Sequence, residues 1–301
     1  MRFSLEIPVG DITPGEYQTA DAIKEMSIAL ENAGIDACYV TDHPAPSSPW
    51  LHANGHDTLD PFTALAFVAC ASTRLLLHTN VIVMPYRNPF LTAKAAATLQ
   101  ILSGNRLILG SGGGYQQEEF DALGVDFQKR GALFDEALDV IRLAWAGGSV
   151  VKAGRNFNAP GNEPRPVPAV QPRIWIGGGS QKAIERAARR GDGWCPFFSA
   201  PTLSKANQES GIQSLAQLSQ KIIEISETRA RLGRDGQFEI AIGPRVTANF
   251  GSKDGAQQYI AALQGLAEVG VTWALIAPSH KSRQSYIENV QWFKEEVISR
   301  L

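Results

Sequence analysis

Cysteine is scarce in this chain, and neither sign of charge is in excess. The three cysteines, Cys38, Cys70 and Cys195, lie far apart among 301 residues and form no Cys-x-x-Cys pair. An odd number at such spacing argues against a disulfide framework, so we expect a cytoplasmic protein whose cysteines are small buried hydrophobes. The formal net charge of -2 provides no broad basic field to neutralise phosphates, which argues against nucleic acid as a partner.

Long apolar runs are also missing. No stretch of about 18 consecutive apolar residues occurs, so we expect no membrane span. The start of the chain, MRFSLEIPVG, lacks the basic segment and apolar core of a signal peptide, and its pattern predicts a β-strand instead.

What the chain does have is an alternation of strands and helices, repeated eight times. Predicted strands begin near residues 3, 37, 76, 107, 174, 194, 239 and 273. Eight such units over about 300 residues predict one (β/α)8 TIM-barrel domain spanning 1–301, with a doubly wound sheet as the alternative. The segment 147–172, rich in Gly, Pro and Arg, predicts a long irregular insertion between strands 4 and 5, and 44–58 predicts a polar loop.

Two of the predicted strands end in glycines. The run RLILGSGGGY (106–115) carries Gly110, Gly112, Gly113 and Gly114, and backbone without side chains can present N–H groups to a ligand or turn where other residues cannot. Functional residues of a barrel lie at the carboxyl ends of its strands, which is where this run falls.

The second glycine run opens a predicted helix. Gly177, Gly178, Gly179 and Ser180 precede it, and the free N–H groups of a first helical turn accept a phosphate. A plain tight turn with a serine cap explains the same residues equally well. The pattern is neither the dinucleotide fingerprint Gly-x-Gly-x-x-Gly nor a phosphate loop ending in Gly-Lys-Ser/Thr.

Asp42 and His43 end the second predicted strand. Histidine suits proton transfer near neutral pH, and its place at a strand's carboxyl end favours function over a capping role. The nearby acidic and histidine residues match no standard metal-ligand spacing, so we expect no metal site. These residues are His52, His56, Asp57 and Asp60.

Several motifs in a fixed order resemble the bacterial luciferase-like monooxygenases and the deazaflavin-dependent oxidoreductases that share their barrel. The motifs are AGIDACYVTDH (33–43), TNVIVMPYRNPFLTAKAAATLQILSGNRLILGSGGGY (79–115), EEFDALGVDFQKRGALFDEALDVIRLAW (118–145), IWIGGGS (174–180) and RRGDGWCPF (189–197). The resemblance covers about residues 3 to 295.

This resemblance implies a flavin or deazaflavin in the mouth of the barrel. Its phosphate would lie on Gly177, Gly178, Gly179 and Ser180, and a non-proline cis peptide, Asn80–Val81, would press on the ring. The glycines Gly110, Gly112 and Gly113 would leave room above that ring. By the same resemblance His43 lies near the reacting ring carbon and Asp42 orients it or balances its charge.

The Asp-His pair, the PYRNPFLTAKAAATL run and the DGW motif look most similar to members that use coenzyme F420. The resemblance therefore implies hydride transfer between F420 and a small organic substrate, in a homodimer formed through helices near strands 2 and 3. An FMN-dependent monooxygenase supplied by a separate flavin reductase is the alternative, and a non-catalytic flavin-binding barrel is a third. Trp50 and Tyr115 depart from the pattern of the family's sugar-phosphate dehydrogenases, which argues against such a substrate.

Overall fold

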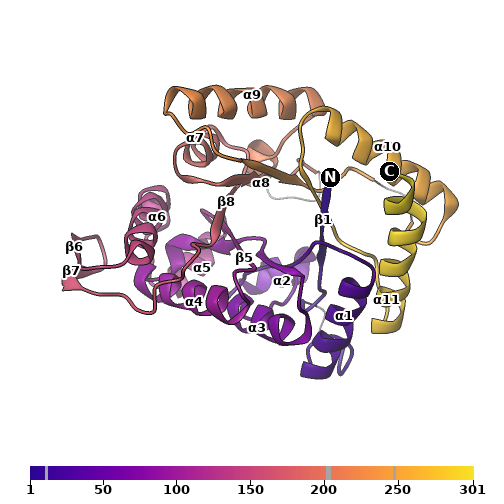
Figure 1. Ribbon diagram of the computed structural model, residues 1–301, viewed down its shortest axis with the longest axis horizontal. Helices are drawn as coiled ribbons and strands as arrows, with labels where there is room; N and C mark the ends of the chain where they lie inside the picture. The colour runs from indigo at the N-terminus through magenta and orange to yellow at the C-terminus, as the bar shows by residue number, and fades with distance from the viewer. Residues whose placement is uncertain (11–12, 201–204, 247–248) are drawn as a thin grey trace.

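Parallel strands form a barrel at the centre of the molecule, with helices around it (Figure 1). The structure is a computed structural model that describes residues 1–10, 13–200, 205–246 and 249–301. Among these residues eight strands close the barrel in the cyclic order β1, β2, β3, β5, β8, β9, β10, β11, because β3 pairs with β5 and β11 with β1. The predicted TIM barrel and its strand positions are confirmed. The strands are β1 (Arg2–Glu6), β2 (Ala37–Val40), β3 (Leu76–Thr79), β5 (Leu107–Gly112), β8 (Arg173–Gly177), β9 (Gly193–Cys195), β10 (Glu239–Ile242) and β11 (Trp273–Ile276).

The helices follow the strands and begin where the sequence provides caps. Asp60 accepts a hydrogen bond from the Thr63 amide and Asn88 from the Phe90 amide, each directly before a proline that suits the first helical turn. The α-helices are α1 (Ala20–Asn32), α2 (Ser48–Asn54), α3 (Pro61–Ala71), α4 (Pro89–Leu102), α5 (Gln117–Ala122), α6 (Arg130–Ala146), α7 (Gln181–Arg190), α8 (Lys205–Ser210), α9 (Leu215–Arg231), α10 (Lys253–Glu268) and α11 (Arg283–Trp292). Shorter helical turns are η1 (Met84–Tyr86), η2 (Phe127–Lys129), η3 (Phe293–Val297) and η4 (Ile298–Arg300).

Two segments are more regular than the sequence predicts. The expected polar loop 44–58 contains α2, which is too short to show helical periodicity. The expected irregular insertion contains an antiparallel hairpin of β6 (Val150–Ala153) and β7 (Asn158–Asn162), which projects from the body at the left of Figure 1. Its strands are largely exposed, and β7 carries Pro and Gly, so no alternating apolar pattern marks them.

The amino-terminal end of the barrel is closed by a buried carboxylate, that of Glu239. It accepts hydrogen bonds from Arg173 at 2.7 and 2.8 Å, from the Trp175 indole at 3.0 Å and from the Trp273 indole at 3.1 Å, and Arg2 pairs with it as well. A buried charge is tolerated where it is paired and hydrogen-bonded in this way. With this end filled, open space inside the barrel lies toward the carboxyl ends of the strands.

The cysteines are only partly as expected. Cys38 and Cys195 are buried, and burial raises the pKa of each thiol to about 12, so both are inert hydrophobes. Cys70 is exposed on α3, which corrects the expectation that all three are buried. Across the described ranges, every helix falls short of the length and apolar character that a membrane crossing requires.

Candidate active site

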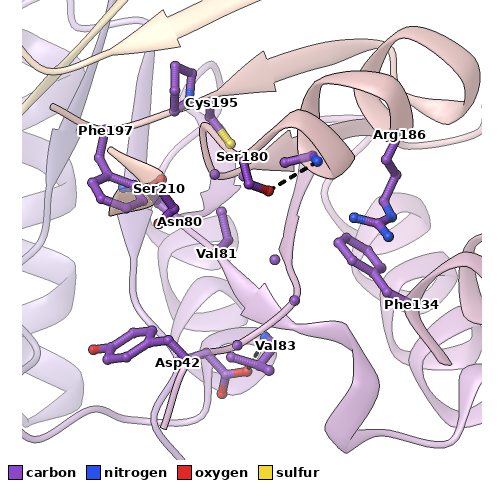
Figure 2. Close-up of a pocket in the computed structure, with 18 of the residues that line it drawn as sticks. Asp42, Asn80, Val81, Val83, Phe134, Ser180, Arg186, Cys195, Phe197 and Ser210 are labelled. Carbon is purple, nitrogen blue, oxygen red and sulfur yellow. Dashed lines mark hydrogen bonds between the residues drawn. The ribbon is translucent and has the colours of Figure 1, made fainter. Parts of the chain in front are cut away.

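A cavity of ≈1340 Å³ lies at the carboxyl ends of the barrel strands. Figure 2 shows side chains from separate parts of the chain around it, among them Asp42, Val81, Ser180 and Phe197. Pockets for small molecules are typically about 300–1,000 Å³. This cavity therefore has room for a large cofactor together with a substrate.

The Asn80–Val81 peptide bond is cis, as the resemblance implies, and both residues line the cavity. The bond interrupts the third barrel strand, so that the short strand β4 (Ile82–Val83) resumes pairing with β5 beyond it. A Cβ at Gly112 would lie 2.7 Å from Val81 Cγ2, and one at Gly177 would lie 3.2 Å from Val81 Cγ1. Two glycines on neighbouring strands thus make room for the Val81 side chain at the floor of the cavity.

The other predicted glycines divide into two groups. Gly113 and Gly178 line the cavity, together with Gly112, Gly177 and Ser180. Gly110 and Gly179 are not among the described residues that line the cavity. A Cβ at Gly110 would lie 2.0 Å from the Thr79 carbonyl oxygen, and one at Gly179 would lie 2.5 Å from that of Ser210. A side chain at either position would collide with neighbouring backbone, so both glycines serve close packing.

The amino-terminus of α7 borders the cavity and has the chemistry to accept an anion. Ser180 caps this helix, its hydroxyl accepting from the Ala183 amide at 3.3 Å (Figure 2), which leaves the first N–H groups, those of Gln181 and Lys182, for a ligand. Gly178 precedes the cap with a φ of +95°, a value that other residues rarely adopt. Lys182 also lines the cavity and adds positive charge.

His43 lies at the edge of the cavity with its Nδ1 already engaged. This nitrogen is 3.2 Å from Glu119 Oε2 and 3.0 Å from the Gln116 amide. A carboxylate only accepts hydrogen bonds, so the contact with Glu119 places the proton on Nδ1 and leaves Nε2 as an acceptor. Gln116 Oε1 is buried without a partner among the described residues. Rotating the side-chain amide by 180° exchanges its oxygen and nitrogen, so that the oxygen accepts from the Nδ1–H of His43.

Glu119 on α5 is the carboxylate that orients His43, and sequence reasoning missed it. Its oxygens also accept from the Tyr86 hydroxyl at 2.8 Å and the Ala45 amide at 3.2 Å. Burial acts to raise the pKa of Glu119, but the hydrogen bonds from His43 and Tyr86 lower it below its ordinary value. The sequence carries no signal for this contact between residues 76 positions apart.

Asp42 does not have the expected contact with His43. Its oxygens accept from the Val83 amide at 3.0 Å and from Arg87 at 2.9 Å, although the residue does line the cavity (Figure 2). Burial raises the pKa of Asp42, and Arg87 offsets part of that effect. Asp42 therefore ties the strand carrying His43 to the segment that follows the cis bond.

Two aromatic rings and a second histidine surround His43. The Trp50 ring centroid lies 4.4 Å from that of His43, and the His56 and Tyr115 centroids lie at 5.3 and 6.0 Å. Because α2 folds back over the strand end, Trp50 reaches His43 although it lies seven positions further along the chain. Trp50 departs from the pattern of the family's sugar-phosphate dehydrogenases in its sequence position, but it still lies next to His43 in space.

The residues considered for a metal have other partners in the structure. His56 Nε2 lies 3.1 Å from the Thr41 hydroxyl, and His52 Nδ1 lies 3.2 Å from the Ser48 hydroxyl. Asp60 caps α3.

Comparison with known proteins identifies the class to which this barrel and cavity belong. A family model described as luciferase-like monooxygenase matches residues 1–289, so the chain belongs to that family. An uncharacterized protein of Mycobacterium tuberculosis is 27% identical over 256 residues, covering 82% of this chain and 80% of the relative. The F420-dependent glucose-6-phosphate dehydrogenase of the same species is 30% identical over 196 residues, covering 63% of this chain and 56% of the relative.

A solved structure shares the fold over nearly the whole chain. It is an F420-dependent secondary alcohol dehydrogenase in complex with an F420-acetone adduct, with a TM-score of 0.79 and 17% identity, covering 99% of this chain and 98% of the other.

Proposed function

We propose that this chain is an F420-dependent oxidoreductase that transfers hydride between the deazaflavin and a small organic substrate. The observation that carries the proposal is one cavity with three features. It joins a helix amino-terminus suited to a phosphate, a cis bulge at Val81 and a histidine with Nε2 free. Relatives named as F420-dependent dehydrogenases support the choice of cofactor.

Coenzyme F420 supplies the hydride chemistry when it is bound, and the protein supplies orientation and electrostatics. The α7 amino-terminus, with Gly177, Gly178 and Ser180, would hold the phosphate. Val81 would shape the ring face of the site. His43, held at Nδ1 by Glu119, would accept or return a proton through Nε2.

Parallel binding titrations test this assignment against its alternatives. Deazaflavin fluorescence would follow F420, and flavin fluorescence would follow FMN, each titrated with the purified protein. Saturable F420 binding with FMN binding at least tenfold weaker supports the proposal. The reverse order favours an FMN monooxygenase that works with a separate reductase. F420 that binds but is never oxidised or reduced by any substrate identifies a non-catalytic flavin-binding barrel.

We also propose that the chain forms a homodimer through α3 and α4. Phe67 on α3 and Leu91 and Leu102 on α4 are exposed apolar side chains on neighbouring helices. Such side chains concentrated on one face are typical of a protein–protein contact. Light scattering after size exclusion would give twice the 32.5 kDa chain mass if the proposal is right, and the chain mass itself if it is wrong.

A further inference from the structure

Tyr39, on β2, faces the inside of the barrel and lines the cavity. Its neighbours Cys38 and Val40 belong to the outer core, whereas Ala37, two residues before it, belongs to the smaller apolar cluster inside the barrel. Because successive side chains of a strand face opposite sides, Tyr39 points inward like Ala37. Its side chain is 6% exposed, and the open space that it borders is the cavity.

Aromatic rings fill the barrel below Tyr39. Its ring centroid lies 6.1 Å from that of His78, and the His78 centroid lies 4.8 Å from that of Trp175. The Trp175 and Trp273 centroids are 5.4 Å apart, and both indoles donate to the Glu239 carboxylate at the amino-terminal end of the barrel. Tyr39 is therefore at the top of this column of rings and forms part of the cavity floor.

The Tyr39 hydroxyl forms no hydrogen bond with the described residues. By contrast, the Tyr86 hydroxyl donates to Glu119 at 2.8 Å, and the Tyr286 hydroxyl donates to the Glu6 carbonyl at 2.6 Å. The Tyr39 hydroxyl is not one of the described atoms that are fully enclosed without a partner, so it reaches the cavity. Burial raises the pKa of Tyr39 well above its ordinary value, so the hydroxyl keeps its proton and can donate it to a ligand.

The features suited to a cofactor follow one another around the barrel toward Tyr39. The α7 amino-terminus follows β8, and the cis bond at Val81 follows β3. Strand β2 pairs with β3 on the side away from β5 and β8. The Asn80 amide donates to the Val40 carbonyl at 2.8 Å, so the bulge begins beside the residue that follows Tyr39. A planar ligand that runs from α7 across Val81 therefore ends at β2, where Tyr39 offers its hydroxyl.

We propose that the Tyr39 hydroxyl donates a hydrogen bond to a carbonyl oxygen at the edge of the cofactor's ring system. Flavins and deazaflavins share a pyrimidinedione edge whose carbonyl oxygens accept such a bond. Tyr39 thus recognises the ring independently of the phosphate at α7. The inference rests on the proposed binding of a flavin-type cofactor, and it holds for F420 and FMN alike.

Tyr39→Phe tests the inference because it removes the hydroxyl and keeps the ring. Fluorescence titrations would use F420 and the deazaflavin ribitol compound FO, which has the same ring without the phosphate. The variant should bind both ligands about tenfold more weakly than the wild type, because the ring carbonyl loses its donor. Lys182→Gln, at α7, should weaken the binding of F420 and leave that of FO unchanged.

Tyr286→Phe is the matched control. It also removes a phenol hydroxyl, but from a side chain of the outer core, and it should bind both ligands as the wild type does.

Two further readouts separate a ligand contact from a structural role. Infrared difference spectra of bound F420 should show a ring carbonyl band at higher frequency in Tyr39→Phe, because a hydrogen bond lowers that frequency. The melting temperature of the cofactor-free variant should equal or exceed that of the wild type, because the hydroxyl has no partner to lose.

The outcomes separate this inference from the cofactor assignment. Wild-type affinity and an unmoved carbonyl band in Tyr39→Phe would overturn the inference and leave the proposed function. A variant that binds both ligands normally and raises only the KM of the substrate would also overturn it, since Tyr39 would then contact the substrate. A protein that binds FMN rather than F420, with an affinity that depends on Tyr39, would support the inference and remove the proposed function. A wild-type protein that binds neither cofactor would overturn both.

Discussion

His43 Nδ1 lies 3.2 Å from Glu119 Oε2, which fixes the tautomer of the histidine, a residue that lines the cavity, and leaves Nε2 as a hydrogen-bond acceptor. The two residues are 76 positions apart, on β2's carboxyl end and on α5. Glu119 acts through His43 and is a positioning residue.

Glu119→Gln should lower kcat by about 10- to 100-fold, because the amide no longer stabilises a protonated imidazole. Cofactor affinity should stay within about twofold, since Glu119 lies behind the histidine. Glu118→Gln, on the exposed face of the same helix, is the matched control. Equal kinetic effects of both changes would contradict the assignment.

His43→Ala should reduce turnover by at least about 100-fold while F420 affinity changes little, because the imidazole acts on the proton rather than on the phosphate. Steady-state kinetics and a cofactor titration on the same preparation measure the two effects. Turnover equal to that of the wild type would remove His43 from the mechanism.

Gly112→Ala should weaken cofactor binding about tenfold or more, because the new methyl group would lie 2.7 Å from Val81 Cγ2 and displace the bulge. Val81→Ala removes the Cγ2 atom that the new methyl group would contact. The double variant should therefore recover part of the lost cofactor affinity. A Gly112→Ala variant with wild-type affinity would show that Val81 does not shape the ring face.

Glu6→Gln should change how stability depends on pH. The folded pKa of about 7 exceeds the ordinary 4.5, so the folded state binds more protons than the unfolded state between these values. Wild-type stability therefore falls as pH rises from 4.5 to 7, by about 3 kcal/mol in total. The variant lacks this loss of stability. Its free energy of unfolding, measured in urea, should therefore rise relative to that of the wild type between pH 4.5 and pH 8. Parallel pH curves for the two proteins would mean that Glu6 is solvated.

The barrel could be predicted because its signals are local. Apolar strands such as 107–109, helix caps such as Asp60 before Pro61, and glycines after strands each depend on a few adjacent residues. The cis bond at Asn80–Val81 came from a family resemblance rather than from the residues themselves. That the chain is one domain remains a prediction.

The partners within the site could not be predicted, because they depend on register and helix placement. Asp42 precedes His43 in sequence, yet it contacts Val83 and Arg87, since adjacent residues at a strand end point in different directions. Glu119 reaches His43 only because α5 packs over the strand end. Gly110 lies two residues before Gly112 on the same face of β5, but deeper in the barrel, where a Cβ would meet the Thr79 carbonyl oxygen and His78.

The central claim is hydride transfer through F420, and a single-turnover absorbance measurement tests it most directly. The protein, loaded with stoichiometric oxidised or reduced F420 without oxygen, would be mixed with alcohols, carbonyl compounds and amines. The account predicts that at least one class changes the deazaflavin absorbance at a rate that His43→Ala lowers by about 100-fold or more. Bound F420 whose absorbance stays constant with every class would contradict it.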